Sequence, residues 1–398
     1  MTQPVAIRFG TLHDHCGEPK RNGTLVIENG RIAALAAPDA AIPANAIEYR
    51  SACVVPGLIN AHAHFEMSGE PQTMGVFVLT TPTQRALACA ENARKALHSG
   101  VTAARDLGST ENLAIDLRDA IAAGRIPGPA IVAAGRAVCM TGGHGWWVGR
   151  EADGEWGVRV AVREQRKAGA DCIKFIATGG VLTKGAVPGI EQLSEIELRA
   201  GIAEAHTHGM RCAAHAIGAG GIANALRAGI DTIEHGHLVD EAGIALFLER
   251  GATLVPTLAA IRCITDNGDD AGMPDFVVRK AREIAERAER NLRAARAAGV
   301  CFAGGSDAGT PYNGHDGYAY ELELMQSMLG MGAREALRAA TVEAARVLGI
   351  ARGTLGVGDA ADLVLLDRDV ESDARPYRAP RAVIRDGRVM FERRATTA

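Results

Sequence analysis

A repeated alternation of two kinds of segment in the middle of the chain restricts its fold more than any other feature. Eight short apolar runs with the character of β-strands recur there, at residues 54–64, 101–107, 130–134, 172–178, 211–215, 232–235, 253–257 and 301–306. They are separated by alanine-rich amphipathic segments, for example 83–98, 158–168, 194–208 and 274–298. Strands that alternate with helices in this way form parallel β-α units.

Eight such units within roughly 300 residues fit a (β/α)8 TIM barrel. An open doubly wound sheet is the alternative, but its first strand is followed by a glycine-rich phosphate-binding fingerprint. The sequence carries no such fingerprint after residue 64. We therefore predict the α/β class, with a barrel over residues 56–354.

The two ends of the chain differ from the middle. Asn29-Gly30 and Asp386-Gly387 each stand between short apolar runs, a pattern that is typical of a β-hairpin turn. Because the two ends of a compact domain often lie close together, we predict that residues 1–55 and 355–398 form one composite β-sandwich domain.

Composition and charge exclude several classes of protein. A formal net charge of -4 offers no basic field for nucleic acid or anionic membranes. No apolar run reaches the roughly 18 residues of a membrane span, and the first residues lack the basic and apolar regions of a signal peptide. We expect a cytoplasmic protein whose partners include neither nucleic acid nor a membrane.

Histidines follow several of the predicted strands. In a barrel of this type the active site lies at the carboxyl ends of the strands. The first strand ends with His62 and His64, the fifth with His215 and the sixth with His235. Residues two apart on a strand point to the same face, so His62 and His64 could bind one metal ion.

Two further residues could complete a metal centre. Asp307 follows the eighth strand, where it could bind a metal or cap the next helix. Lys174 lies inside the apolar fourth strand, where an unpaired ammonium would be very costly. It either forms an internal salt bridge or has reacted with CO2 to give N6-carboxylysine, a carboxylate-like bridge. Four histidines, Lys174 and Asp307 are too many ligands for one tetrahedral zinc with an open position, and they suit two divalent ions.

A few residues are candidates for contact with a substrate or for support of the ligands. His237 is two residues beyond His235, and His144 lies in the glycine-rich loop TGGHG; each could face the substrate or bind only backbone. Tyr312, in the loop after the eighth strand, could hold a substrate carboxylate. Asp106 ends the second strand, where it either orients a ligand histidine or shapes a turn.

Three tryptophans, Trp146, Trp147 and Trp156, cluster around the loop after the third strand. So many large aromatic side chains in an aromatic-poor chain predict a lid or wall of the substrate pocket. A contact between subunits is the alternative, since Trp is enriched at interfaces.

The motifs PGLINAHAH, RDLG, TGGHG, IKFIATGG, IEHGH and GGSDAGTP together resemble those of the amidohydrolase superfamily. The chain is most similar to the Xaa-Pro dipeptidase-like branch that is related to imidazolonepropionase. This resemblance implies a distorted barrel, a homo-oligomer and two metal ions, usually zinc. It also implies that His62, His64 and Asp307 hold the more buried ion, that His215 and His235 hold the second, and that carboxylated Lys174 bridges them.

The expected activity is hydrolysis of an amide C–N bond in a dipeptide or N-acyl amino acid. A metal-bridging hydroxide would attack the carbonyl, and Asp307 would pass a proton to the leaving amine. The main alternative is a mononuclear hydrolase of cyclic amides, like imidazolonepropionase, which uses no bridging lysine. A deaminase is disfavoured because no glutamate follows His215 closely, and a metal-binding scaffold without activity would not need the full ligand set. Zn²⁺, Mn²⁺ and Co²⁺ all suit these ligands.

Overall fold

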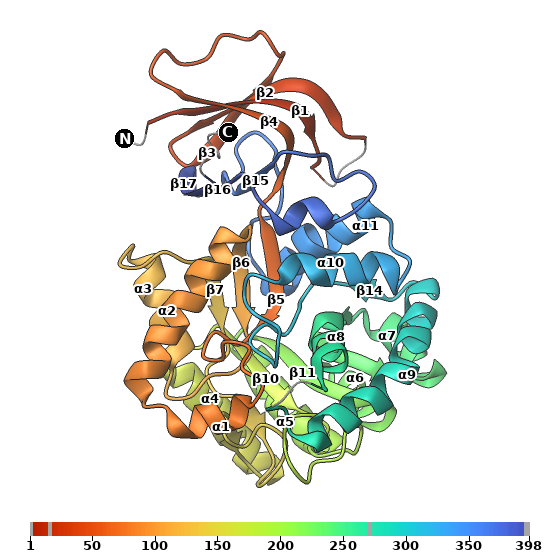
Figure 1. Ribbon diagram of the computed structural model, residues 1–398. Helices are drawn as coiled ribbons and strands as arrows, with labels where there is room; N and C mark the ends of the chain where they lie inside the picture. Colours follow the sequence, from red (N-terminus) through yellow and green to blue (C-terminus); the bar gives the residue numbers. More distant parts are fainter. Residues whose placement is uncertain (1–2, 15–17, 270–271, 394–398) are drawn as a thin grey trace.

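The computed structural model describes residues 3–14, 18–269 and 272–393. A sheet built from the two chain ends lies at one end of the molecule, above a larger body of strands surrounded by helices (Figure 1). Among the described residues, no helix has both the length and the apolar character needed to cross a membrane.

The central strands pair in parallel and form two sheets. One has the order β5-β6-β7 and the other the order β14-β13-β12-β11-β10-β8-β9. Their bounds are β5 Leu58–Ala63, β6 Val101–Asp106, β7 Ala130–Ala133, β8 Val138–Cys139, β9 Arg150–Glu151, β10 Cys172–Ile176, β11 Arg211–Gly218, β12 Thr232–Leu238, β13 Thr253–Val255 and β14 Cys301–Phe302. Each of the eight predicted runs overlaps one of these strands, so the mixed α/β class is confirmed. The two-residue strands β8 and β9, which flank the glycine-rich loop, were not predicted.

Backbone hydrogen bonds connect β5 of the small sheet with the segment that follows β14. The amide of Ala61 donates to Gly304 O at 2.9 Å, and the amide of Asp307 donates to His62 O at the same distance. An isolated parallel bridge between Ala63 and Ala308 continues this pairing. The first and last strands of the body therefore lie side by side, which places His62 next to Asp307.

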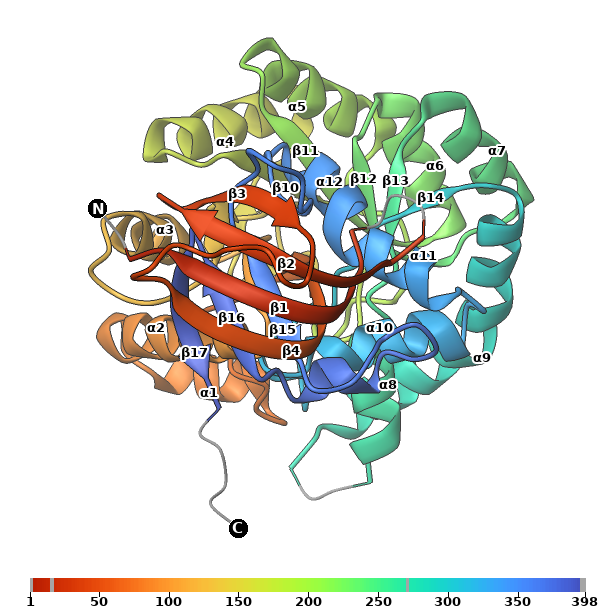
Figure 2. The same ribbon diagram turned by 90° about the horizontal axis from the view of Figure 1, so that it is seen from above.

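Helices cover the outside of these strands (Figure 2). They are α1 Thr73–Leu79, α2 Pro82–His98, α3 Leu113–Ala122, α4 Gly154–Ala168, α5 Glu195–Thr207, α6 Ala219–Ala228, α7 Glu241–Arg250, α8 Leu258–Asn267, α9 Asp275–Ala297, α10 Tyr318–Ser327, α11 Ala333–Arg338 and α12 Ala344–Leu348, with a π-helical turn over Ala339–Glu343. Local sequence explains several helix ends. Capping boxes start α2 at Thr81 and α5 at Ser194, and Gly229 ends α6 in the left-handed conformation.

The two chain ends combine in one seven-stranded sheet of order β17-β16-β15-β4-β1-β2-β3. Its strands are β1 Val5–Leu12, β2 Lys20–Glu28, β3 Arg31–Ala36, β4 Ile47–Pro56, β15 Leu363–Leu366, β16 Ala382–Arg385 and β17 Arg388–Glu392, and a 3-10 turn covers Arg375–Arg378. In place of the expected β-sandwich, the two chain ends form one continuous sheet, because β4 pairs with β1 on one side and with β15 on the other. Side chains from both chain ends, among them Ile7, Leu25, Leu363 and Ile384, share one hydrophobic cluster.

Both predicted hairpin turns are confirmed. Asn29-Gly30 joins β2 to β3 with Glu28 opposite Arg31, and Asp386-Gly387 joins β16 to β17. Both residues of each turn have positive φ angles, 51° and 80° in the first turn and 47° and 70° in the second. This is the geometry that a two-residue hairpin requires and that Asn-Gly and Asp-Gly adopt most readily.

Candidate active site

One cavity lies at the carboxyl ends of the central strands and collects most of the predicted site residues. Its polar lining consists of His62, His64, His144, Lys174, His215, His235, His237, Asp307 and Thr310. The six predicted metal ligands, contributed by five separate strands or strand ends, therefore meet in one place.

Three lone-pair atoms converge at the end of β5. His62 Nε2 and His64 Nε2 each lie 3.2 Å from Asp307 Oδ1. The opposite ring nitrogens face acceptors, since His62 Nδ1 is 2.9 Å from Glu234 Oε2 and His64 Nδ1 is 3.0 Å from Gly108 O. If the Nδ1 atoms carry the hydrogens, both Nε2 atoms present lone pairs to a carboxylate oxygen. Such atoms repel one another unless a proton or a cation lies between them, so this cluster fits a metal ion.

His235 joins this group and extends it towards His215. A nitrogen of His235, one of His62 and an oxygen of Asp307 lie within 4.8 Å of one another. The rings of His215 and His235 are 4.4 Å apart. Burial holds the pKa of both imidazoles well below the usual value, so both are neutral and able to bind a metal.

Lys174 is almost completely buried, with 2% of its surface exposed. Its Nζ has no hydrogen-bond partner among the described residues. Burial lowers the pKa of this amine to about 8, although the charges of Glu234 and Asp307 oppose the shift. An internal salt bridge, one of the two readings of the sequence, is absent from the described contacts of Lys174. Since a buried polar atom without a partner is rare, the position fits a lysine that carries an added acceptor group.

The structure shows a buried ion pair beneath the histidines that sequence reasoning missed. Arg105 Nη2 lies 2.8 Å from Glu234 Oε1, and Arg105 Nε donates to Ala61 O at 2.8 Å. Burial opposes ionisation of Glu234, but Arg105 and His62 lower its pKa to about 2. The ionised carboxylate therefore fixes the orientation of His62 through its Nδ1 atom. The available signal was the same as for Lys174: a charged residue within an apolar strand.

Among the described residues, the hydrogen bonds of the Asp106 carboxylate come from backbone amides. This carboxylate accepts hydrogen bonds from the amides of Phe65, at 2.8 Å, and Gly108, at 3.0 Å. It thereby shapes the turns that follow β5 and β6. The sequence left two roles open for Asp106, orienting a ligand histidine or shaping a turn, and these hydrogen bonds favour the turn. The ring of His64 is oriented by the carbonyl oxygen of Gly108.

The side chains of His144 and His237 also line the active-site cavity. His144 Nδ1 is 2.9 Å from Thr183 Oγ1, and its ring lies 4.6 Å from that of His215. A side chain at Gly180 would come within 2.3 Å of His144 Nε2, so only glycine admits this ring. His237 Nε2 donates to Pro256 O at 2.8 Å, and its Nδ1 has no partner among the described residues. Burial lowers the pKa of both histidines to about 4.

Tyr312 is not brought to this cavity. It adopts a left-handed conformation with φ 58°, and its amide donates to Gly69 O at 2.8 Å. This turn directs the residue to a different groove, shared with Asp266 and Tyr320. Tyr312 also packs against the hydrophobic cluster that includes Ile217 and Ile261 of the cavity wall, and its expected contact with a substrate carboxylate stays a prediction.

Only one of the three tryptophans lines the cavity. Trp147 does so, and its ring lies edge-on to Phe77 at 4.9 Å. Trp146 and Trp156 are exposed to 44% and 78%. The wall that Trp147 forms is continued by aliphatic side chains, namely Met67, Leu107, Val148, Ile176, Val181, Leu182, Ile217, Ile261 and Ile264. Arginine is not among the lining residues.

Comparison with known proteins agrees with this site. The model of the amidohydrolase family matches residues 53–390. Ochratoxinase from Aspergillus niger is 30% identical over 95% of this chain and 84% of its own length. The crystal structure of an Xaa-Pro dipeptidase with methionine bound in the active site is 30% identical, with a TM-score of 0.90 over 98% of this chain and 100% of that one. A prolidase complexed with N-methylphosphonate-L-proline is 31% identical, with a TM-score of 0.89 over the same shares. The chain therefore belongs to the amidohydrolase family and is a hydrolase of carbon–nitrogen amide bonds.

Proposed function

We propose that this enzyme hydrolyses dipeptides or N-acyl amino acids in the manner of an Xaa-Pro dipeptidase, with two divalent metal ions held at the described cavity. The family generally uses divalent metal ions. The observation that carries the proposal is the convergence of His62 Nε2, His64 Nε2 and Asp307 Oδ1 in the cavity that Lys174 also lines, where Lys174 Nζ has no hydrogen-bond partner in the described part of the chain. The two parallel sheets would together form a distorted (β/α)8 barrel over residues 56–354, and residues 1–55 and 355–398 the composite domain.

The six predicted ligands would divide between two ions. His62, His64 and Asp307 would hold one ion, and His215 and His235 the other, with Lys174 as N6-carboxylysine between them. Carbamylation needs a neutral amine, and burial raises the neutral fraction of Lys174 because it lowers the pKa of this amine from 10.5 to about 8. Zinc is the proposed metal, since imidazole and carboxylate ligands suit it.

The protein groups around the ions perform the remaining steps. Bound ions lower the pKa of a water molecule and polarise an amide carbonyl. Asp307 accepts the proton of the attacking water and transfers it to the leaving amine. His237 Nδ1, which has no hydrogen-bond partner among the described residues, and His144 would bind the carbonyl or carboxylate of the substrate. The aliphatic walls exclude bulk water and favour a substrate with an apolar side chain over a charged one.

Metal content tests the proposal directly. We expect purified enzyme to contain close to two zinc ions per chain by elemental analysis, because six ligands exceed the requirement of one zinc. Dialysis against a chelator should abolish amide hydrolysis, and added zinc should restore it. A content near one ion per chain would contradict the binuclear centre and favour the mononuclear hydrolase of cyclic amides.

Glu234→Gln tests the support beneath the metal ligands. The substitution keeps the size of the side chain but removes the negative charge that orients His62, so zinc affinity should fall by about 10–100-fold. The measurement is competition with a zinc chelator at equilibrium. Glu204→Gln is the control, since Glu204 also pairs with an arginine, Arg163, but its described ion pairs include none of the proposed metal ligands. Equal affinities in the wild type and Glu234→Gln would refute the role of Glu234.

A further inference from the structure

A second cavity, with a volume of about 1000 Å³, lies where the sheet of the chain ends meets the helical body. None of its lining residues belongs to the active-site cavity. Its charged lining consists of Arg31, Arg125, Arg352, Arg385, Arg388 and Asp386. Five arginines against one aspartate are a strong local excess of positive charge in a chain whose net charge is -4.

The two hairpin turns build one wall of this cavity. A side chain at Gly387 would come within 2.7 Å of Gly30 Cα, so the turns touch. Both are joined to Ala361, whose amide donates to Gly30 O and whose carbonyl accepts from the amide of Gly387. Arg31 follows the first turn and Arg388 follows the second, and both residues line the cavity.

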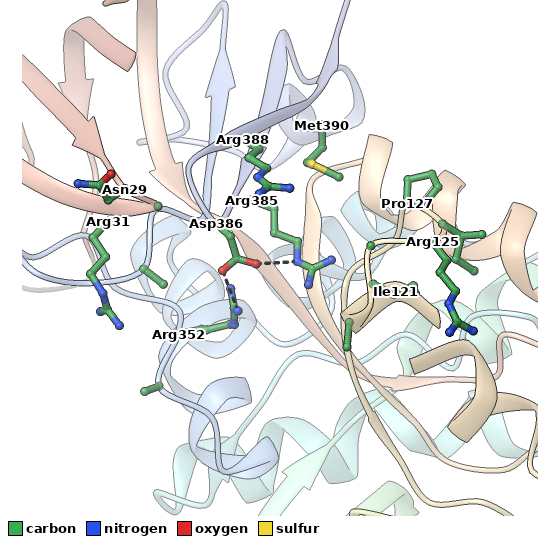
Figure 3. A pocket seen from close by; sticks show the side chains of 16 residues that line it. Asn29, Arg31, Ile121, Arg125, Pro127, Arg352, Arg385, Asp386, Arg388 and Met390 are labelled. Atoms are coloured by element: carbon green, nitrogen blue, oxygen red, sulfur yellow. Dashed lines mark hydrogen bonds and ion pairs between the residues drawn. The ribbon is translucent and has the colours of Figure 1, made fainter. Parts of the chain in front are cut away.

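The carboxylates in this region neutralise only two of the guanidinium groups. Arg352 pairs with Asp386 at 2.9 Å and with the buried Asp362. Arg385 Nε lies 3.4 Å from the other oxygen of Asp386. Figure 3 shows this trio in the centre of the cavity, with Arg388 above it. Asp386 thus already shares its charge between two arginines.

The other three arginines have no carboxylate partner in the described part of the chain. Arg31 donates to Gly358 O at 2.8 Å, which leaves its charge uncompensated. Arg125 and Arg388 are exposed, and no hydrogen bond or ion pair of their guanidinium groups occurs among the described residues. Arg31 and Arg125 flank the centre of the cavity from opposite sides (Figure 3). Like charges on both sides of a cavity repel each other, and a bound anion would remove that repulsion.

We propose that this cavity binds a small organic anion that carries two or more phosphate or carboxylate groups. Guanidinium groups recognise both kinds of oxyanion through paired N–H donors. The volume lies in the range of small-molecule sites. Since β3, β16 and β17 form one side and the loop after α3 forms the other, the anion connects the terminal sheet with the helical body and stabilises the folded enzyme.

Calorimetric titration of the metal-replete enzyme at about 150 mM salt tests the proposal. Fructose 1,6-bisphosphate is the phosphate probe and propane-1,2,3-tricarboxylate the carboxylate probe, so the two arms identify the preferred oxyanion. We expect saturable binding of at least one probe, with one site per chain, and a higher Tm in its presence. In Arg125→Ser/Arg388→Ser the affinity should fall at least about tenfold, because each lost charge-assisted contact is worth more than that factor.

The matched control is Arg287→Ser/Arg290→Ser, which removes two exposed arginines of α9 that have no ion pair among the described residues. It should bind the probe as the wild type does. Arg125→Lys/Arg388→Lys should retain part of the affinity, since the charge remains. Absence of saturable binding, or equal binding by Arg125→Ser/Arg388→Ser, would overturn the proposal. Binding of an octaglutamate peptide but of neither small anion would also overturn it, in favour of a docking surface for an acidic protein segment.

Discussion

Lys174→Ala should lower kcat/KM for amide hydrolysis by at least about 100-fold. Loss of a residue that merely supports a metal ligand costs about 10–100-fold, and we assign Lys174 a direct bridging role. The factor corresponds to about 2.7 kcal/mol of transition-state stabilisation. The fall should be accompanied by loss of close to one zinc ion per chain, measured on the same preparation.

A small carboxylic acid should partly reverse this loss. Alanine leaves a space beside the histidines, and acetate or propionate could place a carboxylate there in place of the carbamate. Lys174→Met is the matched control, because a side chain of similar length fills the space and rescue should fail. Full activity of Lys174→Ala, or rescue of both variants alike, would contradict a bridging carboxylysine. Thermal unfolding of both variants separates a folding defect from a catalytic one.

Asp307→Asn should reduce amide hydrolysis by about 10²–10⁴-fold, the range of general acid–base catalysis. The carboxylate is the group within 3.2 Å of both His62 Nε2 and His64 Nε2, and these imidazoles hold the pKa of Asp307 below its usual range although burial opposes this. Asp307 is therefore ionised at neutral pH and has the free carboxylate oxygen that a proton acceptor needs, whereas asparagine has no carboxylate.

The leaving group distinguishes proton transfer by Asp307 from metal binding by the same residue. An amine must be protonated as it departs, whereas the alkoxide of an ester departs more readily without a proton. Asp307→Asn should therefore lose less activity on an ester analogue than on the amide. Equal losses on both substrates would contradict the proton shuttle and leave only a ligand role. Asp106→Asn is the control, since Asp106 is also buried but its carboxylate accepts hydrogen bonds from backbone amides. This variant should have a lower Tm and a kcat/KM close to that of the wild type.

Much of the site was predictable because the relevant rules are local. Residues two apart on a strand share a face, which predicted that His62 and His64 act together. Parallel strands end at one rim, which predicted that His215, His235 and Asp307 would meet them there. The hairpin turns followed from Asn-Gly and Asp-Gly alone, because these dipeptides adopt the positive φ angles that the turn requires.

Other features depend on which segments become neighbours. Arg105 and Glu234 each lie within an apolar strand, but their pairing required the packing of β6 against β12 across the interior. Tyr312 lies close to Asp307 in the sequence, yet a left-handed turn directs it to another groove.

The chain by itself therefore determined the order of strands and helices, the hairpin turns and the residue types that could bind a metal. Only the tertiary structure decided which charges face each other: the ion pair under His62, the unpartnered amine of Lys174, and the arginines gathered where the two chain ends meet the helical body. The physical reason is the distance along the chain over which each of these effects acts. Backbone preferences and side-chain periodicity act over a few residues, whereas electrostatic partners are set by contacts between segments that lie far apart in the sequence, 129 residues in the case of Arg105 and Glu234.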